Sequence, residues 1–290
     1  MNLTKCCLVF LLSLSIFGCA PGGGSKTNKA PLPKMGPFGS CIPEADLMAN
    51  NIVRGEVVKS ADQDAKAVAA LLVGNSICTT AAIADDVLLT AAHCVETEDA
   101  ATTLAVFHHS ISCESGYSPE KHSVKVRKVV RHKGYDFKKE VPERRDDVAL
   151  IFLEGKVPAG TPIYKIADPA SINDDNQLFL YGYGKTSGKS GGSGILRRAV
   201  VDRKNYTFDL EHKLAAIDQK VGSGICRGDS GGPTLVKIGG EFQILGVNSF
   251  VMGEKEGNIC SLAGFQALAY SYVDWISLEI RAYRAEFAPR

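Results

Sequence analysis

The sequence predicts an all-β protein of two barrels closed by a single C-terminal helix. From residue 52 onward, short runs rich in Val, Ile, Leu and aromatic residues are separated by clusters of Gly, Pro, Asn and Asp, a pattern typical of strands joined by turns. A body of about 240 residues built in this way fits two barrels better than one. Helical periodicity is convincing only near the end of the chain.

The individual elements follow from these runs. The strand-like runs are 68–73, 86–90, 123–130, 148–153, 177–181 and 242–247. The closing helix is predicted over about 271–287, because apolar residues recur there at spacings near three and four. These residues are Tyr272, Trp275, Ile276, Leu278, Ile280 and Tyr283.

Charge gives little indication of a partner. The chain of 290 residues carries 33 basic and 32 acidic side chains, for a net charge of +1. A nucleic-acid partner would normally need a concentrated basic face, so none is expected. We expect a monomer that needs no cofactor.

The first 18 residues have the composition of an export signal. Lys5 supplies a positive charge, and the apolar stretch 8–17 is too short to cross a bilayer as a permanent helix. The stretch ends at Gly18-Cys19, which resembles the lipobox of bacterial lipoproteins. That resemblance implies lipidation of Cys19 and a membrane-anchored protein facing the periplasm or the cell exterior. The alternative is ordinary cleavage near Ala20 and a secreted protein.

Residues 19–51 are predicted to form a flexible tether and a possible pro-segment. The stretch from Pro21 to about Pro37 contains Gly22-Gly23-Gly24-Ser25 and several prolines. Such a composition cannot bury a core, so it should hold the following domain away from a surface.

The cysteines indicate disulfides. Of nine, Cys6 and Cys7 leave with the signal and Cys19 is assigned to the lipid, which leaves six. Six cysteines allow fifteen pairings, and their spacing alone does not choose among them. An even number in an exported chain without a C-x-x-C pair favours disulfides over a metal site.

Three short segments carry groups suited to nucleophilic catalysis. They are Thr90-Ala-Ala-His93-Cys94, Asp147-Val-Ala-Leu150 and Gly228-Asp-Ser230-Gly-Gly-Pro233. A serine hydroxyl needs an imidazole to take its proton, and the imidazole needs a carboxylate to fix its tautomer. Backbone N–H groups in a tight glycine turn can stabilise the developing oxyanion. The order His, Asp, Ser differs from the orders in subtilisins and α/β-hydrolases.

These segments resemble the three signature regions of the chymotrypsin-like (trypsin-like, S1) serine peptidases. The resemblance covers residues 52–285 and implies two six-stranded antiparallel barrels, roughly 52–165 and 166–270, within a domain 52–290. It implies His93 as general base and acid, Asp147 as its orienting carboxylate and Ser230 as nucleophile. The amides of Gly228 and Ser230 would form the oxyanion hole, and polypeptides would be the substrates. Asp146, the neighbour of Asp147, is expected to face solvent.

The same resemblance assigns the cysteines. It implies the bridges Cys78–Cys94, beside the histidine, and Cys226–Cys260, around the specificity pocket. Cys41 and Cys113 are then left to pair, which would keep a cleaved pro-segment attached to the body.

Activation by cleavage is a further implication. Ile52-Val53-Arg54-Gly55 resembles the family's new N-terminus, whose freed amine pairs with the Asp next to the nucleophile, here Asp229. Asn51 stands where many relatives carry a basic residue, so either an unusual activator cuts after Asn51 or activation differs. The alternative is that Ile52 simply begins the first strand.

The specificity pocket is expected to lack a carboxylate. Trypsin-type relatives place an Asp six residues before the nucleophile, where this chain has Gly224, followed by Ile225. Val251 stands where the pocket wall normally has glycine, and the opposite wall aligns with Gly264. This arrangement resembles elastase-type members and favours small or medium apolar side chains before the scissile bond.

Two rival interpretations remain at this point. The fold could be a catalytically silent binding module, or the enzyme could act on esters. A metal site at His108 and His109 is not expected, because adjacent residues on a strand face opposite sides.

Overall fold

The structure is a computed structural model that describes residues 40–47, 55–60, 62–136, 138–139, 145–185, 192–254 and 259–288. The predicted export signal, Cys19 and Ile52 lie outside these residues. Among the described residues, no helix has both the length and the apolar character needed to cross a bilayer.

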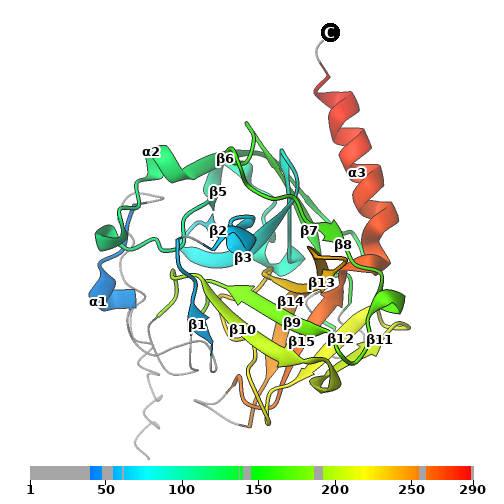
Figure 1. The fold of residues 1–290 in the computed structure, drawn as a ribbon. Helices are drawn as coiled ribbons and strands as arrows, with labels where there is room; N and C mark the ends of the chain where they lie inside the picture. Colours follow the sequence, from blue (N-terminus) through cyan, green and yellow to red (C-terminus); the bar gives the residue numbers. More distant parts are fainter. Residues whose placement is uncertain are drawn as a thin grey trace, which may run out of the picture. The chain divides into compact units, whose positions relative to one another are not determined.

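The first half of the domain is a closed six-stranded barrel (Figure 1). Neighbouring strands are antiparallel and follow the order β2-β3-β4-β7-β6-β5. Its strands are β2 (Val68–Val73), β3 (Ser76–Ala84), β4 (Val87–Thr90), β5 (Thr103–Val106), β6 (Ser123–Arg131) and β7 (Ala149–Leu153). All residues of β4 and β7 are buried, which explains why these two strands are apolar except for Thr90 and do not alternate.

The second half is a nine-stranded sheet that follows the path β1-β10-β9-β13-β14-β15-β12-β11, with β8 added parallel to β14. Its strands are β1 (Glu56–Val57), β8 (Lys165–Ile166), β9 (Gln177–Gly182), β10 (Arg197–Asp202), β11 (Tyr206–Asp209), β12 (Leu214–Asp218), β13 (Pro233–Ile238), β14 (Glu241–Met252) and β15 (Ala263–Leu268). This sheet curves beneath the barrel in Figure 1.

Short helices connect the strands, and one longer helix ends the chain. The α-helices are α1 (Glu44–Leu47), α2 (Pro119–His122) and α3 (Val273–Glu286). The 3₁₀ turns are η1 (Gln63–Ala65), η2 (Ala92–Val95), η3 (Ala100–Thr102), η4 (Cys113–Ser115), η5 (Pro169–Ser171), η6 (Arg203–Asn205) and η7 (Ala269–Tyr272).

The predicted fold class is confirmed: the chain is mostly β, with a closed barrel, a second sheet and a C-terminal helix. The second sheet differs in detail from the expected six-stranded barrel. The short strand β1 extends one edge by pairing with β10, and the β11–β12 hairpin forms the other edge. Neither β1, which has two residues, nor the β11–β12 hairpin is among the strand-like runs that the sequence predicts.

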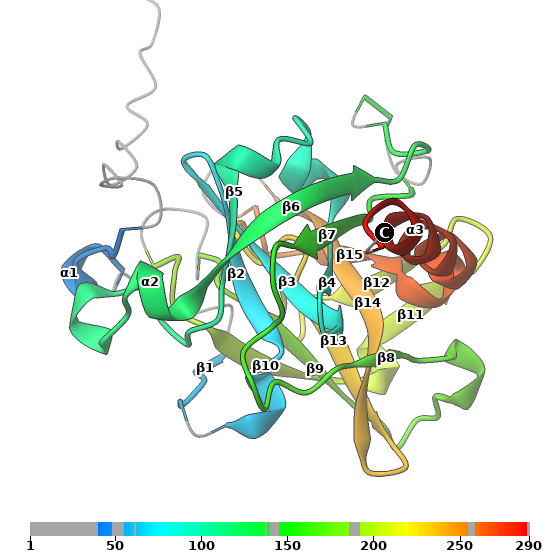
Figure 2. The ribbon, with the colours of Figure 1, turned by 90° about the horizontal axis from the view of Figure 1, so that it is seen from above.

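The C-terminal helix packs on the outside of the barrel, as the view from above shows (Figure 2). The ring of Tyr283 stacks on that of Phe152 in β7, with centroids 4.1 Å apart. Ile276 and Tyr283 are buried, as the periodicity predicts, but 56% of Leu278 is exposed. Leu278 lies on the outer face because only part of the predicted apolar stripe meets the barrel.

Residues 40–47 pack against the body, although they belong to the stretch predicted as a tether or pro-segment. The Ile42 amide donates to the Ile111 carbonyl at 3.0 Å, and the Cys113 amide donates to the Ile42 carbonyl at 2.9 Å. Leu47 is 1% exposed. Its apolar side chain is therefore part of the core, which a freely moving tether could not provide.

Candidate active site

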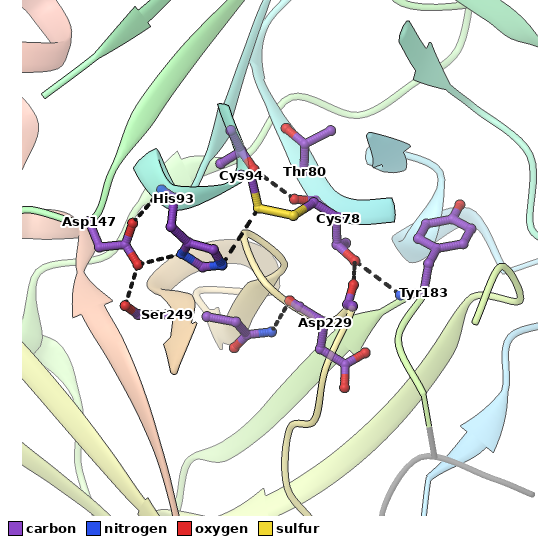
Figure 3. Close-up of a disulfide and its surroundings, with 12 residues drawn as sticks. Cys78, Thr80, His93, Cys94, Asp147, Tyr183, Asp229 and Ser249 are labelled. Carbon is purple, nitrogen blue, oxygen red and sulfur yellow. Dashed lines mark hydrogen bonds and ion pairs between the residues drawn. A yellow bond between two sulfur atoms is a disulfide. The ribbon is translucent and has the colours of Figure 1, made fainter. Parts of the chain in front are cut away.

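His93 lies at the edge of the barrel, in the turn η2 that follows β4. Its backbone N–H donates to Asp147 Oδ1 at 2.9 Å, and its ring Nδ1 lies 2.7 Å from Asp147 Oδ2. Since an ionised carboxylate can only accept, Nδ1 carries the proton. Ring Nε2 faces away from Asp147 and lies 3.9 Å from the sulfur of Cys94 (Figure 3).

Asp147 precedes β7 and is 1% exposed. A hydroxyl of β14 reaches it as well, because Ser249 donates to Oδ2. Burial opposes ionisation of this carboxyl, but the charge of His93 and the hydrogen bonds from His93 and Ser249 outweigh it. The pKa of Asp147 therefore lies below its ordinary value, and the carboxylate is available to hold an imidazolium.

Ser230 lies in a glycine turn just before β13. Gly228 has a φ of +94°, and a Cβ there would stand 2.7 Å from the Cα of Gly184. Gly231 has a φ of +79°, and its Cβ would stand 2.1 Å from the hydroxyl oxygen of Thr90. Only glycine fits at both positions, so the motif around the serine is a steric requirement of this turn.

Two residues that sequence reasoning missed hold the turn. The hydroxyl of Thr79, in β3, donates to the Gly228 carbonyl at 3.1 Å, and the Thr79 amide donates to the Ser230 carbonyl at 2.7 Å. The buried amide of Asn248, in β14, donates to the Asp229 carbonyl at 2.9 Å. Neither residue belongs to a recognisable motif, since only the fold brings it to the turn.

The turn leaves two amides available. The amides of Asp229, Gly231 and Gly232 donate to backbone carbonyls. In contrast, no acceptor among the described residues takes the amides of Gly228 and Ser230. Two such N–H groups, one on the serine itself and one two residues before it, can bind a carbonyl oxygen that becomes negatively charged.

His93, Asp147 and Ser230 line one cavity of about 410 Å³. They come from the barrel and from the second sheet, and 137 residues separate the histidine from the serine in the sequence. Ile225 and Val251 also line this cavity. Sequence reasoning missed most of the remaining lining residues, which are Tyr135, Cys226, Arg227, Asn248, Ser249, Phe250 and Ile259.

Gly224 and Gly264 are not among the lining residues of the cavity. A Cβ at Gly224 would stand 2.2 Å from Cδ of Gln219, and a Cβ at Gly264 would stand 2.4 Å from its Oε1. The two glycines therefore lie behind the cavity wall, packed on a buried glutamine.

Asp229, next to the serine, is fully enclosed at 1% exposure. It accepts hydrogen bonds from the amides of Gly184 at 2.9 Å and Cys226 at 2.8 Å. Burial nevertheless dominates and raises the pKa of Asp229 to about 7. Its proposed partner Ile52 lies outside the described residues.

Asp146 does not face solvent as expected. It is 8% exposed, and its Oδ1 lies 3.1 Å from the ammonium of Lys213. Its amide meets the hydroxyl oxygen of Tyr272 at 3.0 Å. With a φ of +62°, Asp146 takes a conformation that is uncommon outside glycine. The expectation failed because two acidic residues in a turn give no sign of a cation supplied from a distant hairpin.

His108 and His109 are also arranged differently from the expectation. They lie in a loop rather than on a strand, so their rings come together, with centroids 4.4 Å apart. His122 lies at the same distance from His108. In the described part of the chain, one group of potential metal ligands is found, consisting of Cys78, His93 and Cys94. Its two cysteines form a disulfide with each other, so their sulfurs are not available as thiolate ligands.

Three disulfides are present in the structure: Cys41–Cys113, Cys78–Cys94 and Cys226–Cys260. The second lies directly beside the imidazole of His93 (Figure 3). The third joins the segment before Ser230 to the segment before β15. Bonded cysteines of this number fit an oxidising, extracellular environment.

Comparison with known proteins agrees with this fold and site. Residues 52–276 match the trypsin family. The chain is 29% identical to serine protease SP24D of Anopheles gambiae over 74% of this chain and 76% of that protein. It is 30% identical to trypsin Blo t 3 of Blomia tropicalis, over 60% and 68%, and 28% identical to CLIP domain-containing serine protease B4 of Anopheles gambiae. The last match covers 52% of this chain but only 45% of that relative.

The fold and the site thus define a chymotrypsin-like serine hydrolase. The match over residues 52–276 is more than half of the chain, and the chain belongs to the trypsin family of serine proteases.

Proposed function

We propose that the protein is an exported serine endopeptidase that uses His93, Asp147 and Ser230. The observation that carries this proposal is that the three side chains line one cavity while His93 is hydrogen-bonded twice to Asp147. A silent binding module would have no need for a histidine held in one tautomer beside a serine and two available amides. A polar triad of this kind therefore favours an enzyme.

The proposed reaction proceeds through an acyl-enzyme. Ser230 Oγ attacks the carbonyl carbon of the substrate while His93 Nε2 takes the hydroxyl proton. The amides of Gly228 and Ser230 stabilise the oxyanion. His93 then gives its proton to the leaving amine as the C–N bond breaks. A water molecule releases the acyl group in a second cycle, in which His93 takes and returns a proton. Asp147 stays ionised throughout, consistent with its lowered pKa.

We expect the processed protein to cleave after small or medium apolar residues, because Ile225 and Val251 occupy the cavity wall and neither carries a charge. Digestion of a peptide library, read by mass spectrometry, measures this preference and separates peptide from ester hydrolysis. Val251→Gly should shift the preference toward larger residues by about tenfold or more, since methylene-sized changes in a pocket are worth 10–200-fold. A strong preference of the wild-type protein for Arg over Ala or Val would contradict the pocket assignment.

We further propose that cleavage after Asn51 frees the Ile52 amine to pair with Asp229. Before cleavage, a pKa of about 7 lies above the ordinary value of an unfolded aspartate, so the folded state binds the extra proton. The stability that this gives is complete below pH 4 and is lost as the pH rises through about 7. The difference between the pKa of Asp229 in the folded and unfolded states corresponds to about 4 kcal/mol in the free energy of unfolding.

Urea unfolding between pH 4 and 8 tests this pairing. The unprocessed protein should lose stability over this range, and the loss should be absent in Asp229→Asn, whose amide resembles the protonated acid. In the processed protein, the ammonium of Ile52 should keep Asp229 ionised and remove the loss. Equal pH slopes for both forms would contradict the pairing. Analysis of the mature N-terminus identifies the cleavage site and also shows whether Cys19 carries a lipid, as we propose for the membrane-anchored form.

A further inference from the structure

Gln219 directly follows β12 and is 4% exposed. It does not itself line the cavity, but it is hydrogen-bonded to the backbone of Ile225, which does. Its side-chain amide is fully used. Nε2 donates to the carbonyls of Cys260 at 2.7 Å and Ile225 at 3.2 Å, while Oε1 accepts from the Ile225 amide at 2.8 Å. A buried amide with both ends bonded is strongly fixed, because losing any of these bonds would leave a polar group unpaired.

This amide connects two segments that border the cavity. One segment contains Ile225, which lines the cavity, and the other contains Cys260, which follows the lining residue Ile259. The disulfide Cys226–Cys260 joins the same segments covalently. Gln219 is bonded to both the N–H and the C=O of Ile225, so we expect it to determine how far the Ile225 side chain extends into the cavity.

The two glycines behind the wall make room for this glutamine. A Cβ at Gly224 would stand within 2.6 Å of three Gln219 atoms, and a Cβ at Gly264 would meet Gln219 Oε1 at 2.4 Å and Ile225 Cγ1 at 2.7 Å. No side chain fits at either position while Gln219 is in place. The space behind the cavity is therefore filled by a neutral amide that comes from a different strand.

We propose that Gln219 is a specificity-determining positioning residue, which closes the base of the substrate pocket by filling it and by holding Ile225 in its wall. This inference rests on the proposed peptidase function. A shallow, uncharged base accepts small or medium apolar side chains and leaves no room for a long or cationic one. Gln219 acts through Ile225 and the pocket shape rather than by touching the reacting atoms.

The test combines substrate selectivity with a double-mutant cycle. Gln219→Ala, Gly224→Ala and the double variant are compared with wild type, with active sites counted by a fluorophosphonate label. Gln219→Ala should raise kcat/KM for Leu or Phe relative to Ala before the scissile bond by about tenfold or more. Gln243→Ala, in β14 and away from the cavity, is the matched control and should leave this ratio unchanged.

The cycle also reports on packing without any need for catalysis. Gly224→Ala should lower the Tm when Gln219 is present, because its methyl group overlaps the amide. It should lower the Tm much less in the Gln219→Ala background, since contacting residues show non-additive effects. A fall in kcat/KM that is equal for all substrates, or strictly additive Tm changes, would overturn the proposal.

Failure of the proposed function would look different. A wild-type protein that hydrolyses no peptide and takes up no fluorophosphonate would refute the peptidase assignment and, with it, the role of Gln219 in selectivity. A non-additive Tm cycle in that protein would still show that the amide fills the space behind residue 224. Active wild-type protein with unchanged selectivity in Gln219→Ala would refute the Gln219 assignment alone.

Discussion

Replacing Ser230 with alanine should abolish detectable peptide hydrolysis and leave the fold intact. The substitution removes one hydroxyl oxygen, whereas the backbone bonds that hold the turn, from Thr79 and Asn248, remain. In enzymes that use such a triad, loss of the serine lowers kcat by about 10⁶. Residual catalysis of about 10³–10⁴ over water would come from binding and the oxyanion amides.

Active-site labelling measures the loss of the nucleophile, and circular dichroism measures whether the fold is retained. The variant should take up no fluorophosphonate and should unfold at the temperature of the wild type. Ser171→Ala, in the exposed turn η5, is the matched control and should keep full activity. Turnover or labelling that persists in Ser230→Ala would refute the nucleophile assignment and would favour another reactive group.

The second large effect is expected at Asp147. Asn in its place keeps the size but presents an N–H₂ group where the carboxylate accepts from the backbone of His93, its ring Nδ1 and Ser249. The imidazole would then be held in the wrong tautomer, with Nε2 protonated and unable to accept from Ser230. A fall in kcat of about 10⁴ is expected on this ground.

Steady-state kinetics on a peptide with a small apolar residue before the scissile bond would measure this fall. KM should change far less than kcat, because Asp147 is 1% exposed and its carboxylate is used by His93 and Ser249. Asp202→Asn provides a control, since its carboxylate is exposed and, within the described part of the chain, forms an ion pair with Lys204. A variant of Asp147 that retains most of its kcat would show that His93 is oriented by some other group.

The sequence predicts four of the six barrel strands, β2, β4, β6 and β7, because their runs are rich in Val, Leu and Ile, whereas β3 and β5 match none of the predicted runs. The runs 68–73 and 123–130 coincide with β2 and β6 to within one residue. The candidate nucleophile is also recognisable in the sequence, since the glycines around Ser230 are constrained sterically. Gly228 and Gly231 need positive φ values and close backbone contacts, so the turn keeps a recognisable pattern.

Residues whose role depends on contacts with distant parts of the chain have no such pattern in the sequence. Gln219 belongs to none of the sequence motifs, and Asp146 is expected to face solvent. Each is buried because a distant segment supplies its partners, Cys260 in one case and Lys213 in the other. Periodicity and motif spacing describe residues that are close in the sequence. They do not predict hydrogen bonds between residues 41 positions apart, as for Gln219 and Cys260, or 67 positions apart, as for Lys213 and Asp146.

Thr79 ties the nucleophile turn to the opposite half of the molecule. It is 149 residues from Gly228 and 104 from Tyr183, and it is hydrogen-bonded to both. Contacts of such long range form late, after the chain entropy of a large loop has been lost. A fragment that contained the second sheet alone would keep the sequence of the serine motif but would lack the Thr79 hydrogen bonds that hold its conformation. We therefore expect the nucleophile turn to take its active shape only after both halves of the chain have been synthesised and have folded together.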